Sequence, residues 1–309
     1  MRQAFIQALC GLAAADDRIV LLTGDLGYMV MEPFIERFRS RFFNVGVAEQ
    51  NMIGVATGLA EAGLRPYAYS IATFASLRCL EFIRNGPVLH RLPVRVVGMG
   101  MGFEYGHAGP THYAVEDVSV LRTFPGLTIV IPADSEQAAK AIQATADIEG
   151  PVYYSLGKDD RLSVTGLGGS FELGRLQIAR NGDDLAILSM GSVASEAAAA
   201  AEMLSSRGVN ATLGIVSSFN PDPVDDIAGL LSRFQFAITV ESQTASGGLA
   251  ALVGTVIASK GLPCRLRLLA IRNSHDGTSG SQQDRWRKHG LDRENIIDAA
   301  LVSLGVSPR

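Results

Sequence analysis

Short apolar segments that alternate with helical segments constrain the fold of this chain more than any other feature. Segments of strand length, such as Ile19–Thr23 and Pro93–Gly98, are followed by longer segments with apolar residues at helical spacing, such as Glu136–Ile148. Strands that are apolar along their whole length are typical of a parallel sheet covered by helices on both faces. The other predicted strands here are Arg65–Tyr69, Leu127–Ile131, Val152–Ser155 and one beginning at Phe42, and the other predicted helices are Ala4–Ala15, Glu32–Phe38, Ile71–Arg84, Glu116–Thr123 and one beginning at Glu49.

A second alternating set follows a stretch in which the periodicity fails. Glycines accumulate over Leu156–Asp184, which we interpret as an interdomain connection containing a short strand. The chain has 309 residues, enough for two domains with their own cores. We therefore predict an α/β protein of two doubly wound domains, over residues 1–165 and 180–309. The later predicted elements are Leu185–Ser189, Ala194–Ser206, Ala211–Val216, Asp222–Leu231, Phe236–Val240, Gly248–Lys260, Arg265–Ile271 and one closing helix over Trp286–Leu304.

The stretch Phe42–Gly63 is the first candidate for a functional site. An apolar strand turns at Gly46 into a helical pattern, which places Glu49 in the first turn of a helix. A carboxylate at that position is favoured by the helix dipole, so a purely structural role is one interpretation. The segment is nearly free of other charge, and Gly54 and Gly58 permit close packing of its helix. Burial there would disfavour the ionised form of Glu49 and prepare it as a general acid.

The loop over 106–117 is the second candidate, because it follows a predicted buried strand. Ligands lie at the carboxyl ends of strands in open α/β sheets. His107 and His112 could bind a metal, but no thiol or third ligand accompanies them, so we favour a hydrogen-bonding role for His112. The glycines of Val96–Gly102 resemble half of a dinucleotide fingerprint, yet the last glycine and the following helix are missing. Phe74, on an apolar helix face, is by default a core residue.

Composition and charge exclude several classes of protein. The net charge of −4 comes without a basic stripe, so nucleic acid is not expected as a partner. The three cysteines stand far apart in apolar contexts, which predicts buried thiols and a cytoplasmic protein. No apolar run is long enough to cross a membrane, and Arg2, Gln3 and Gln7 interrupt any signal peptide.

Six ordered motifs together resemble the pyrimidine-binding domain of transketolases and 1-deoxyxylulose-5-phosphate synthases. Three later segments, Thr239-Val240-Glu241, Gly247-Gly248-Leu249 and Lys288-His289-Gly290-Leu291, resemble the C-terminal domain of the same proteins. The resemblance covers almost the whole chain. The six motifs are Thr23-Gly24-Asp25-Leu26, Asn44-Val45-Gly46-Val47-Ala48-Glu49-Gln50-Asn51, Ala72-Thr73-Phe74, Gly109-Pro110-Thr111-His112, Glu116-Asp117 and Pro132-Ala133-Asp134.

This resemblance implies thiamine diphosphate as the cofactor. Glu49 takes the position of a glutamate that hydrogen-bonds N1′ of the aminopyrimidine ring, where protonation favours the imino tautomer that removes the thiazolium C2 proton. Phe74 matches an aromatic residue that stacks on that ring. His112 matches a histidine that hydrogen-bonds the donor sugar. Asp25 belongs to a matching motif and Ile71 replaces a phenylalanine on the pyrimidine side, so both are expected to contact the cofactor.

The resemblance also implies a partner chain. Family members hold the diphosphate through magnesium with a Gly-Asp-Gly segment and a downstream Asn, and this sequence has no such segment; Asn181-Gly182-Asp183 is not one. We therefore expect a split enzyme whose other subunit carries that motif, binds Mg²⁺ and provides the diphosphate-binding domain. A shared ligand needs an extensive contact between the chains. Two copies of this chain are expected to pair as a homodimer within a heterotetramer.

Departures from the family limit the choice of substrate. Where transketolases carry an acid and an aspartate before Gly-Pro-Thr-His, this chain has His107 and Ala108. Gly100 stands where a histidine is expected to contact a sugar phosphate, and Lys158 is the remaining nearby cation. We expect His107, His112 and Lys158 to contact substrate, and we expect a two-carbon ketol transfer with a specialised or non-phosphorylated sugar. The alternatives are a β subunit of a 2-oxo acid dehydrogenase, a deoxyxylulose phosphate synthase fragment, or a non-catalytic interaction subunit.

Overall fold

A seven-stranded sheet forms the first half of the fold in the computed structural model, which describes residues 1–273 and 277–307. The strand order is β10-β5-β6-β4-β3-β1-β2, and all neighbours run parallel except β10. Strands β1, β4, β5 and β6 are buried along their whole length, as the sequence predicts, and so is the short strand β10. The strands are β1 (Ile19–Thr23), β2 (Phe42–Asn44), β3 (Arg65–Ile71), β4 (Arg95–Met99), β5 (Thr128–Val130), β6 (Val152–Leu156) and β10 (Ser218–Phe219).

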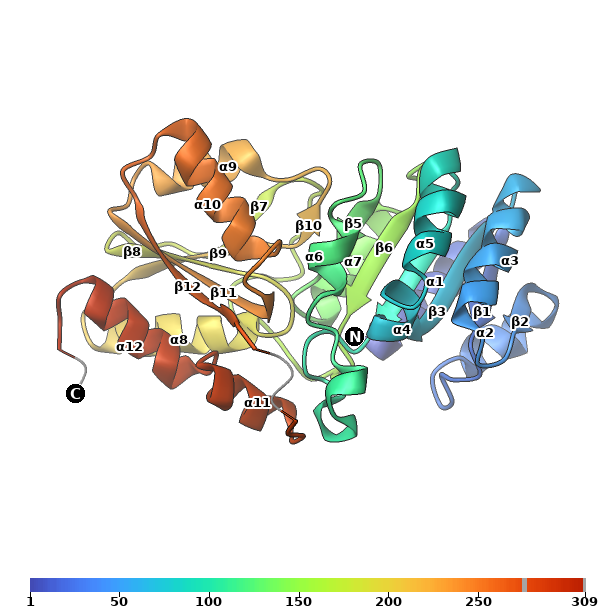
Figure 1. Ribbon diagram of the computed structural model, residues 1–309, viewed down its shortest axis with the longest axis horizontal. Helices are drawn as coiled ribbons and strands as arrows, with labels where there is room; N and C mark the ends of the chain where they lie inside the picture. Colours follow the sequence, from blue (N-terminus) through green and yellow to red (C-terminus); the bar gives the residue numbers. More distant parts are fainter. Residues whose placement is uncertain (274–276, 308–309) are drawn as a thin grey trace.

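Helices cover both faces of this sheet (Figure 1). Helix α1 contacts both α2 and α7 on one face, while α3 packs with α5, and α4 packs with α6, on the other. The α-helices are α1 (Arg2–Ala15), α2 (Glu32–Arg37), α3 (Glu49–Glu61), α4 (Ala72–Ser76), α5 (Leu80–Ile83), α6 (Asp117–Leu121) and α7 (Ser135–Ala144). Shorter helical turns are η1 (Arg39–Arg41), the π-type turn η2 (Arg84–Val88), η3 (Gly106–Ala108) and η4 (Pro110–His112).

The segment predicted as one helix over Ile71–Arg84 is instead divided into three pieces. Helix α4 ends at Ser76, α5 begins at Leu80, and η2 continues from Arg84. Cys79 has φ −100° and ψ 9°, outside the helical region, and Pro87 inside η2 cannot donate a backbone hydrogen bond. Apolar spacing alone did not reveal these interruptions.

The second sheet has five strands in the order β12-β11-β8-β9-β7, all parallel except the edge strand β7. In Figure 1, α9 and α10 lie above this sheet and α8 and α12 below it. The prediction of two doubly wound α/β sheets is confirmed, and β7 is the short strand expected in the connection. The elements are β7 (Leu176–Arg180), β8 (Leu185–Ser189), α8 (Ala194–Ser206), β9 (Ala211–Val216), α9 (Val224–Leu231), β11 (Phe236–Thr244), α10 (Leu249–Lys260), β12 (Arg265–Ile271), α11 (Gln282–His289) and α12 (Arg293–Ser303).

The single closing helix predicted over Trp286–Leu304 is wrong, because two helices are present. Helix α11 ends at His289, and the next residue, Gly290, has a left-handed φ of 69°, which suits glycine. The side chain of Asp292 then accepts a hydrogen bond from the N–H of Asn295 and begins α12. Both signals stand in the sequence, but the apolar spacing runs through them.

The two halves are joined by strand pairing as well as by the connecting segment. Strand β10 comes from the second half and runs antiparallel to β5, with Phe219 opposite Ile129. The N–H of Ile131 also donates to the carbonyl of Ser217 at 2.7 Å. Apolar residues of both halves, including Val130 and Phe219, belong to one buried cluster. The apolar pattern predicts no strand at Ser218–Phe219, because two residues are too few to display a period.

The structure also tests three further expectations, on the cysteines, on the glycines of α3 and on membrane-spanning helices. The thiols of Cys10, Cys79 and Cys264 are free and buried, as predicted. Gly54 and Gly58 lie on the exposed side of α3, where an added Cβ would meet no atom within 4 Å, so they do not pack against this chain's own core. Among the helices of the described residues, none has the length and apolar character needed to span a bilayer.

Glu241 fixes the start of α10 from inside the second half. Its side chain is fully buried, and its two carboxyl oxygens accept the N–H groups of Leu249 and Ala250, both at 2.8 Å. Burial raises the pKa of Glu241 from its usual 4.5 to about 7, against the lowering effect of these two N–H groups. The folded protein therefore binds this proton more tightly than the unfolded chain does.

This linkage predicts a measurable pH dependence. The contribution of Glu241 to the free energy of unfolding is complete below pH 4.5 and is lost as pH rises through about 7. As pH rises between these limits, the wild type loses this contribution and Glu241→Gln does not. The free energy of unfolding of Glu241→Gln should therefore rise relative to that of the wild type by on the order of 3 kcal/mol, since one pKa unit corresponds to about 1.4 kcal/mol. Urea unfolding across this pH range measures the difference. Glu202→Gln, at an exposed position of α8, should show the same dependence of unfolding free energy on pH as the wild type. If Glu241→Gln also shows the wild-type dependence, the prediction is contradicted.

Candidate active site

The predicted site residues gather at the carboxyl edge of the first sheet. Glu49 begins α3 directly after the turn that follows β2, as predicted, and its side chain is only 1% exposed. Ile71 is the last residue of β3, and the loop carrying His112 follows β4. Parallel strands bring their carboxyl ends to one edge, so segments distant in the sequence meet there.

The carboxyl group of Glu49 has two side-chain partners. The hydroxyl of Ser70 donates to Oε1 at 3.0 Å, and Nη1 of Arg78 donates to Oε2 at 2.6 Å. The segment that carries Glu49 has little other charge of its own, but the guanidinium of Arg78, from outside that segment, is an ion-pair partner of Glu49. Sequence reasoning missed both partners; the only signal was that Arg78 lies four residues after Phe74, on the same side of a helical turn.

Phe74 connects Glu49 with His112. The Arg78 guanidinium lies over the Phe74 ring, with Cζ 4.2 Å from the ring centroid. The imidazole of His112 meets the same ring edge-on, with centroids 5.1 Å apart. Nδ1 of His112 lies 2.9 Å from the hydroxyl of Thr111, which holds the imidazole in place. The structure thus brings together the three residues on which the family resemblance depends most.

Asp25 and Ile71 lie beside these groups. Oδ1 of Asp25 accepts a hydrogen bond from Nδ2 of Asn44 at 2.8 Å, while Oδ1 of Asn44 accepts the N–H groups of Asp25 and Gly46. These bonds fix the turn that leads to Glu49. Gly24, next to Asp25, is so close that an added Cβ would lie 3.5 Å from Oε1 of Glu49. Ile71 immediately follows Ser70, the hydroxyl partner of Glu49.

His107 and Lys158 line a neighbouring cavity of about 520 Å³. Nζ of Lys158 lies 4.0 Å from the centroid of the Tyr105 ring, and this ring lies 6.3 Å from that of His112. Tyr105, which sequence reasoning missed, therefore connects the cavity with the Glu49 site. Burial, together with the charge of Arg2, lowers the pKa of Lys158.

A second acid lies in the wall of this cavity. The N–H of Lys158 donates to the carboxyl group of Glu104, and burial raises the pKa of Glu104 to about 7. Its Oε1 has no hydrogen-bond partner among the described residues. Sequence reasoning did not single out Glu104. The described residues contain no group of three or more His, Cys, Asp and Glu side chains suited to a metal ion.

Two domain families match this chain almost end to end. The transketolase pyrimidine-binding domain matches residues 1–160, and the transketolase C-terminal domain matches residues 174–296. The chain belongs to the transketolase family. The resemblance drawn from the motifs is confirmed, including its two-domain content.

Relatives in the transketolase family match over nearly their full length. A putative transketolase C-terminal section from Methanocaldococcus jannaschii is 35% identical over 98% of this chain and 96% of its own. One of the subunits of an apulose-4-phosphate transketolase from Phocaeicola vulgatus is 32% identical over 97% of this chain and 96% of its own. Both relatives are sections or subunits, which agrees with the C-terminal half of a split transketolase.

A solved structure extends the agreement to three dimensions. A split-gene transketolase described as an inactive β4 tetramer superposes with a TM-score of 0.88 and 30% identity, covering 99% of each chain. The arrangement of both transketolase sheets is therefore that of a split-gene member of the family.

Proposed function

We propose that this chain is the pyrimidine-binding subunit of a two-chain, thiamine diphosphate-dependent transketolase that transfers a two-carbon ketol unit from a ketose to an aldehyde. The observation that carries the proposal is the buried carboxyl group of Glu49 beside Phe74 and His112. A carboxyl group that is 1% exposed, and whose guanidinium partner Arg78 lies over the ring of Phe74, is poorly explained by helix capping alone. Relatives of the same length that are named as transketolase subunits support it.

The residues present fit the cofactor. Glu49 and Phe74 already contact a flat hydrogen-bond donor, the Arg78 guanidinium, on its edge and on its face. An aminopyrimidine ring is also flat and presents a donor at its edge when N1′ is protonated. When bound, thiamine diphosphate supplies a carbanion that the protein's own side chains cannot.

Each residue of this chain has a separate task in the proposal. Glu49 holds and delivers the proton at N1′, and Ser70 orients its carboxyl group. Phe74, Ile71 and Asp25 shape the pocket for the ring. His112 hydrogen-bonds the sugar oxygen next to the reacting carbon.

The substrate cavity supports a specialised sugar. Lys158 is the cation that would face an anionic group, and His107 replaces the acid found in other transketolases. Arg2 and Arg161 line the same cavity, but Arg2 donates to the carbonyl of Lys158 and Arg161 is paired with Asp159. One similar chain is named for apulose-4-phosphate, which supports a phosphorylated sugar other than the usual pentose phosphates. Because a single ammonium binds phosphate less specifically than a paired guanidinium, we expect poor activity with xylulose 5-phosphate.

The proposal assigns Mg²⁺ and the diphosphate to a partner subunit with a Gly-Asp-Gly segment and a downstream Asn. The exposed apolar side chains of α3, α5 and the segments beside them support a contact with other chains. Gly54 and Gly58 lie on the same helix and would let another helix approach closely. We propose a heterotetramer of two copies of each chain, and the unpaired cysteines support a cytoplasmic location. The exposed apolar side chains proposed for this contact between chains are Val47, Val55, Phe82 and Leu89.

Calorimetry with the two chains tests the proposal. Thiamine diphosphate with Mg²⁺ should bind the complex roughly 100-fold more tightly than it binds this chain alone, since two charge-assisted hydrogen bonds to the diphosphate contribute about 3 kcal/mol. The partner to use is a chain from the same organism that carries the Gly-Asp-Gly segment and the downstream Asn. Equal affinity with and without that chain would contradict a shared cofactor site. Absence of cofactor binding to the complex would favour a non-catalytic subunit.

A further inference from the structure

A single arginine touches both residues that the proposed function assigns to the pyrimidine ring. Nη1 of Arg78 lies 2.6 Å from Oε2 of Glu49, and Cζ lies 4.2 Å from the centroid of Phe74. The guanidinium is planar, donates a hydrogen bond at its edge and presents its face to an aromatic ring. These are the contacts that a protonated aminopyrimidine would make with the same two side chains.

The ion pair has a physical reason in the free subunit. Glu49 is almost completely buried, and Ser70 donates to only one of its oxygens. A buried carboxylate without a counter-charge is strongly destabilising, so an unoccupied pyrimidine site would leave Glu49 in an unfavourable environment. Arg78 removes this problem by supplying both the charge and the second hydrogen bond.

Arg78 is also placed so that it can leave. Its side chain is 41% exposed, and its backbone lies in the turn between α4 and α5. The guanidinium is already partly hydrated, so it can turn into water without breaking a regular helix. The cost of this rotation is the loss of the ion pair with Glu49, which a protonated aminopyrimidine in the same place would offset. The same rotation would uncover one edge of Glu49 and one face of Phe74 together.

We propose that Arg78 closes the pyrimidine site of the free subunit and must swing out before thiamine diphosphate binds. This inference rests on the proposed function. Arg78 is thus a positioning residue that acts through Glu49 and Phe74. Because only the open fraction of a closed site can bind, the measured affinity is reduced in proportion to that fraction.

The test is a titration of the complex of both chains with thiamine diphosphate and MgCl₂. Arg78→Ala should bind the cofactor roughly tenfold more tightly than the wild type, which corresponds to a site that is about nine-tenths closed. Stopped-flow measurements should show that the gain comes from faster association. Arg207→Ala is the control, because Arg207 is an exposed arginine at the end of α8, in the second half of the fold and outside the proposed contact with other chains; it should bind as the wild type does.

Competition by free guanidinium provides a second test. Free guanidinium chloride at a non-denaturing concentration should weaken cofactor binding to Arg78→Ala more than NaCl does at equal concentration, because the ion refills the vacated place. Weaker or unchanged binding by Arg78→Ala would overturn the inference, since Arg78 would then hold the cofactor or be irrelevant to it. In that case the wild-type complex still binds cofactor and the proposed function stands. If no complex binds thiamine diphosphate, both the function and this inference fall.

Discussion

Glu49→Gln is expected to lower kcat of the two-chain enzyme by roughly 10²–10⁴-fold, the usual contribution of a positioned acid. The amide keeps the shape of the side chain and can still bond to Ser70, but it cannot deliver a proton to the ring nitrogen. Arg78 loses its ionic partner, yet its side chain is 41% exposed, so the free charge can turn to water. Folding and assembly should therefore persist, which sedimentation of the complex would verify.

The control for this substitution lies on the same helix. Glu61→Gln changes a carboxylate at the exposed end of α3 and should leave kcat near the wild-type value. Turnover by Glu49→Gln within a factor of two or three of the wild type would remove Glu49 from the mechanism, whatever the cofactor affinity. Loss of assembly in Glu49→Gln alone would indicate a structural role for this carboxyl group.

Arg95→Met should destabilise the fold more than any other single change considered, by about 3–5 kcal/mol. Arg95 is fully buried at the start of β4, and its guanidinium donates to the carbonyls of Ala146, Ile148 and Gly150. Methionine has a similar length but no donor, so the carbonyls of Ile148 and Gly150, in the turn between α7 and β6, would lose this partner, each at a cost of about 1–3 kcal/mol. Among the described residues, the carbonyl of Ala146 would keep only the longer bond from Arg65, at 3.3 Å. Urea unfolding measures the loss.

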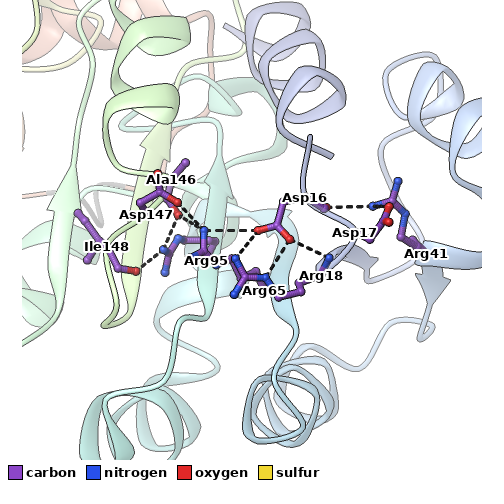
Figure 2. A network of polar contacts seen from close by, with 9 residues as sticks. All are labelled: Asp16, Asp17, Arg18, Arg41, Arg65, Arg95, Ala146, Asp147 and Ile148. Atoms are coloured by element: carbon purple, nitrogen blue, oxygen red, sulfur yellow. Dashed lines mark hydrogen bonds and ion pairs between the residues drawn. The ribbon is translucent and has the colours of Figure 1, made fainter. Parts of the chain in front are cut away.

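The neighbouring Arg65 is the matched control (Figure 2). It reaches the same turn through Asp147 at 2.7 Å and the carbonyl of Ala146 at 3.3 Å, and it lies 3.5 Å from Asp16. The Asp147 side chain is 92% exposed, and the other two contacts are long. Arg65→Met should therefore cost about 1 kcal/mol or less. Equal losses for Arg65→Met and Arg95→Met would refute the role of burial, and a loss below about 1 kcal/mol for Arg95→Met would mean that the turn finds other donors.

The motifs of the candidate site could be predicted because each one is local. Glu49 follows a strand and a glycine turn, so its place at the start of α3 required no knowledge of distant residues. Phe74 and His112 were selected by resemblance, and the parallel sheet then brought them to the same edge. Tyr105 and Glu104 carry no motif, and only the path of the loop after β4 places them beside Lys158.

The helix boundaries that were predicted wrongly have a common cause. The division of the predicted helix over Ile71–Arg84 and of the predicted closing helix depends on single residues such as Pro87 and Gly290. The spacing of apolar residues continues across such positions, because the separate helices still bury the same side. Periodicity therefore predicts which face is buried more reliably than it predicts where a helix ends.

The sequence by itself determined the two α/β sheets, the family and the position of Glu49, since these depend on repeating patterns and local motifs. Only the tertiary structure decided that Arg78 and Ser70 hold Glu49 and that β10 joins the first sheet. These contacts join residues far apart in the chain, and their formation depends on how the strands and helices pack. No local period records such a contact, which is why the charge next to Glu49 was found only in the folded molecule.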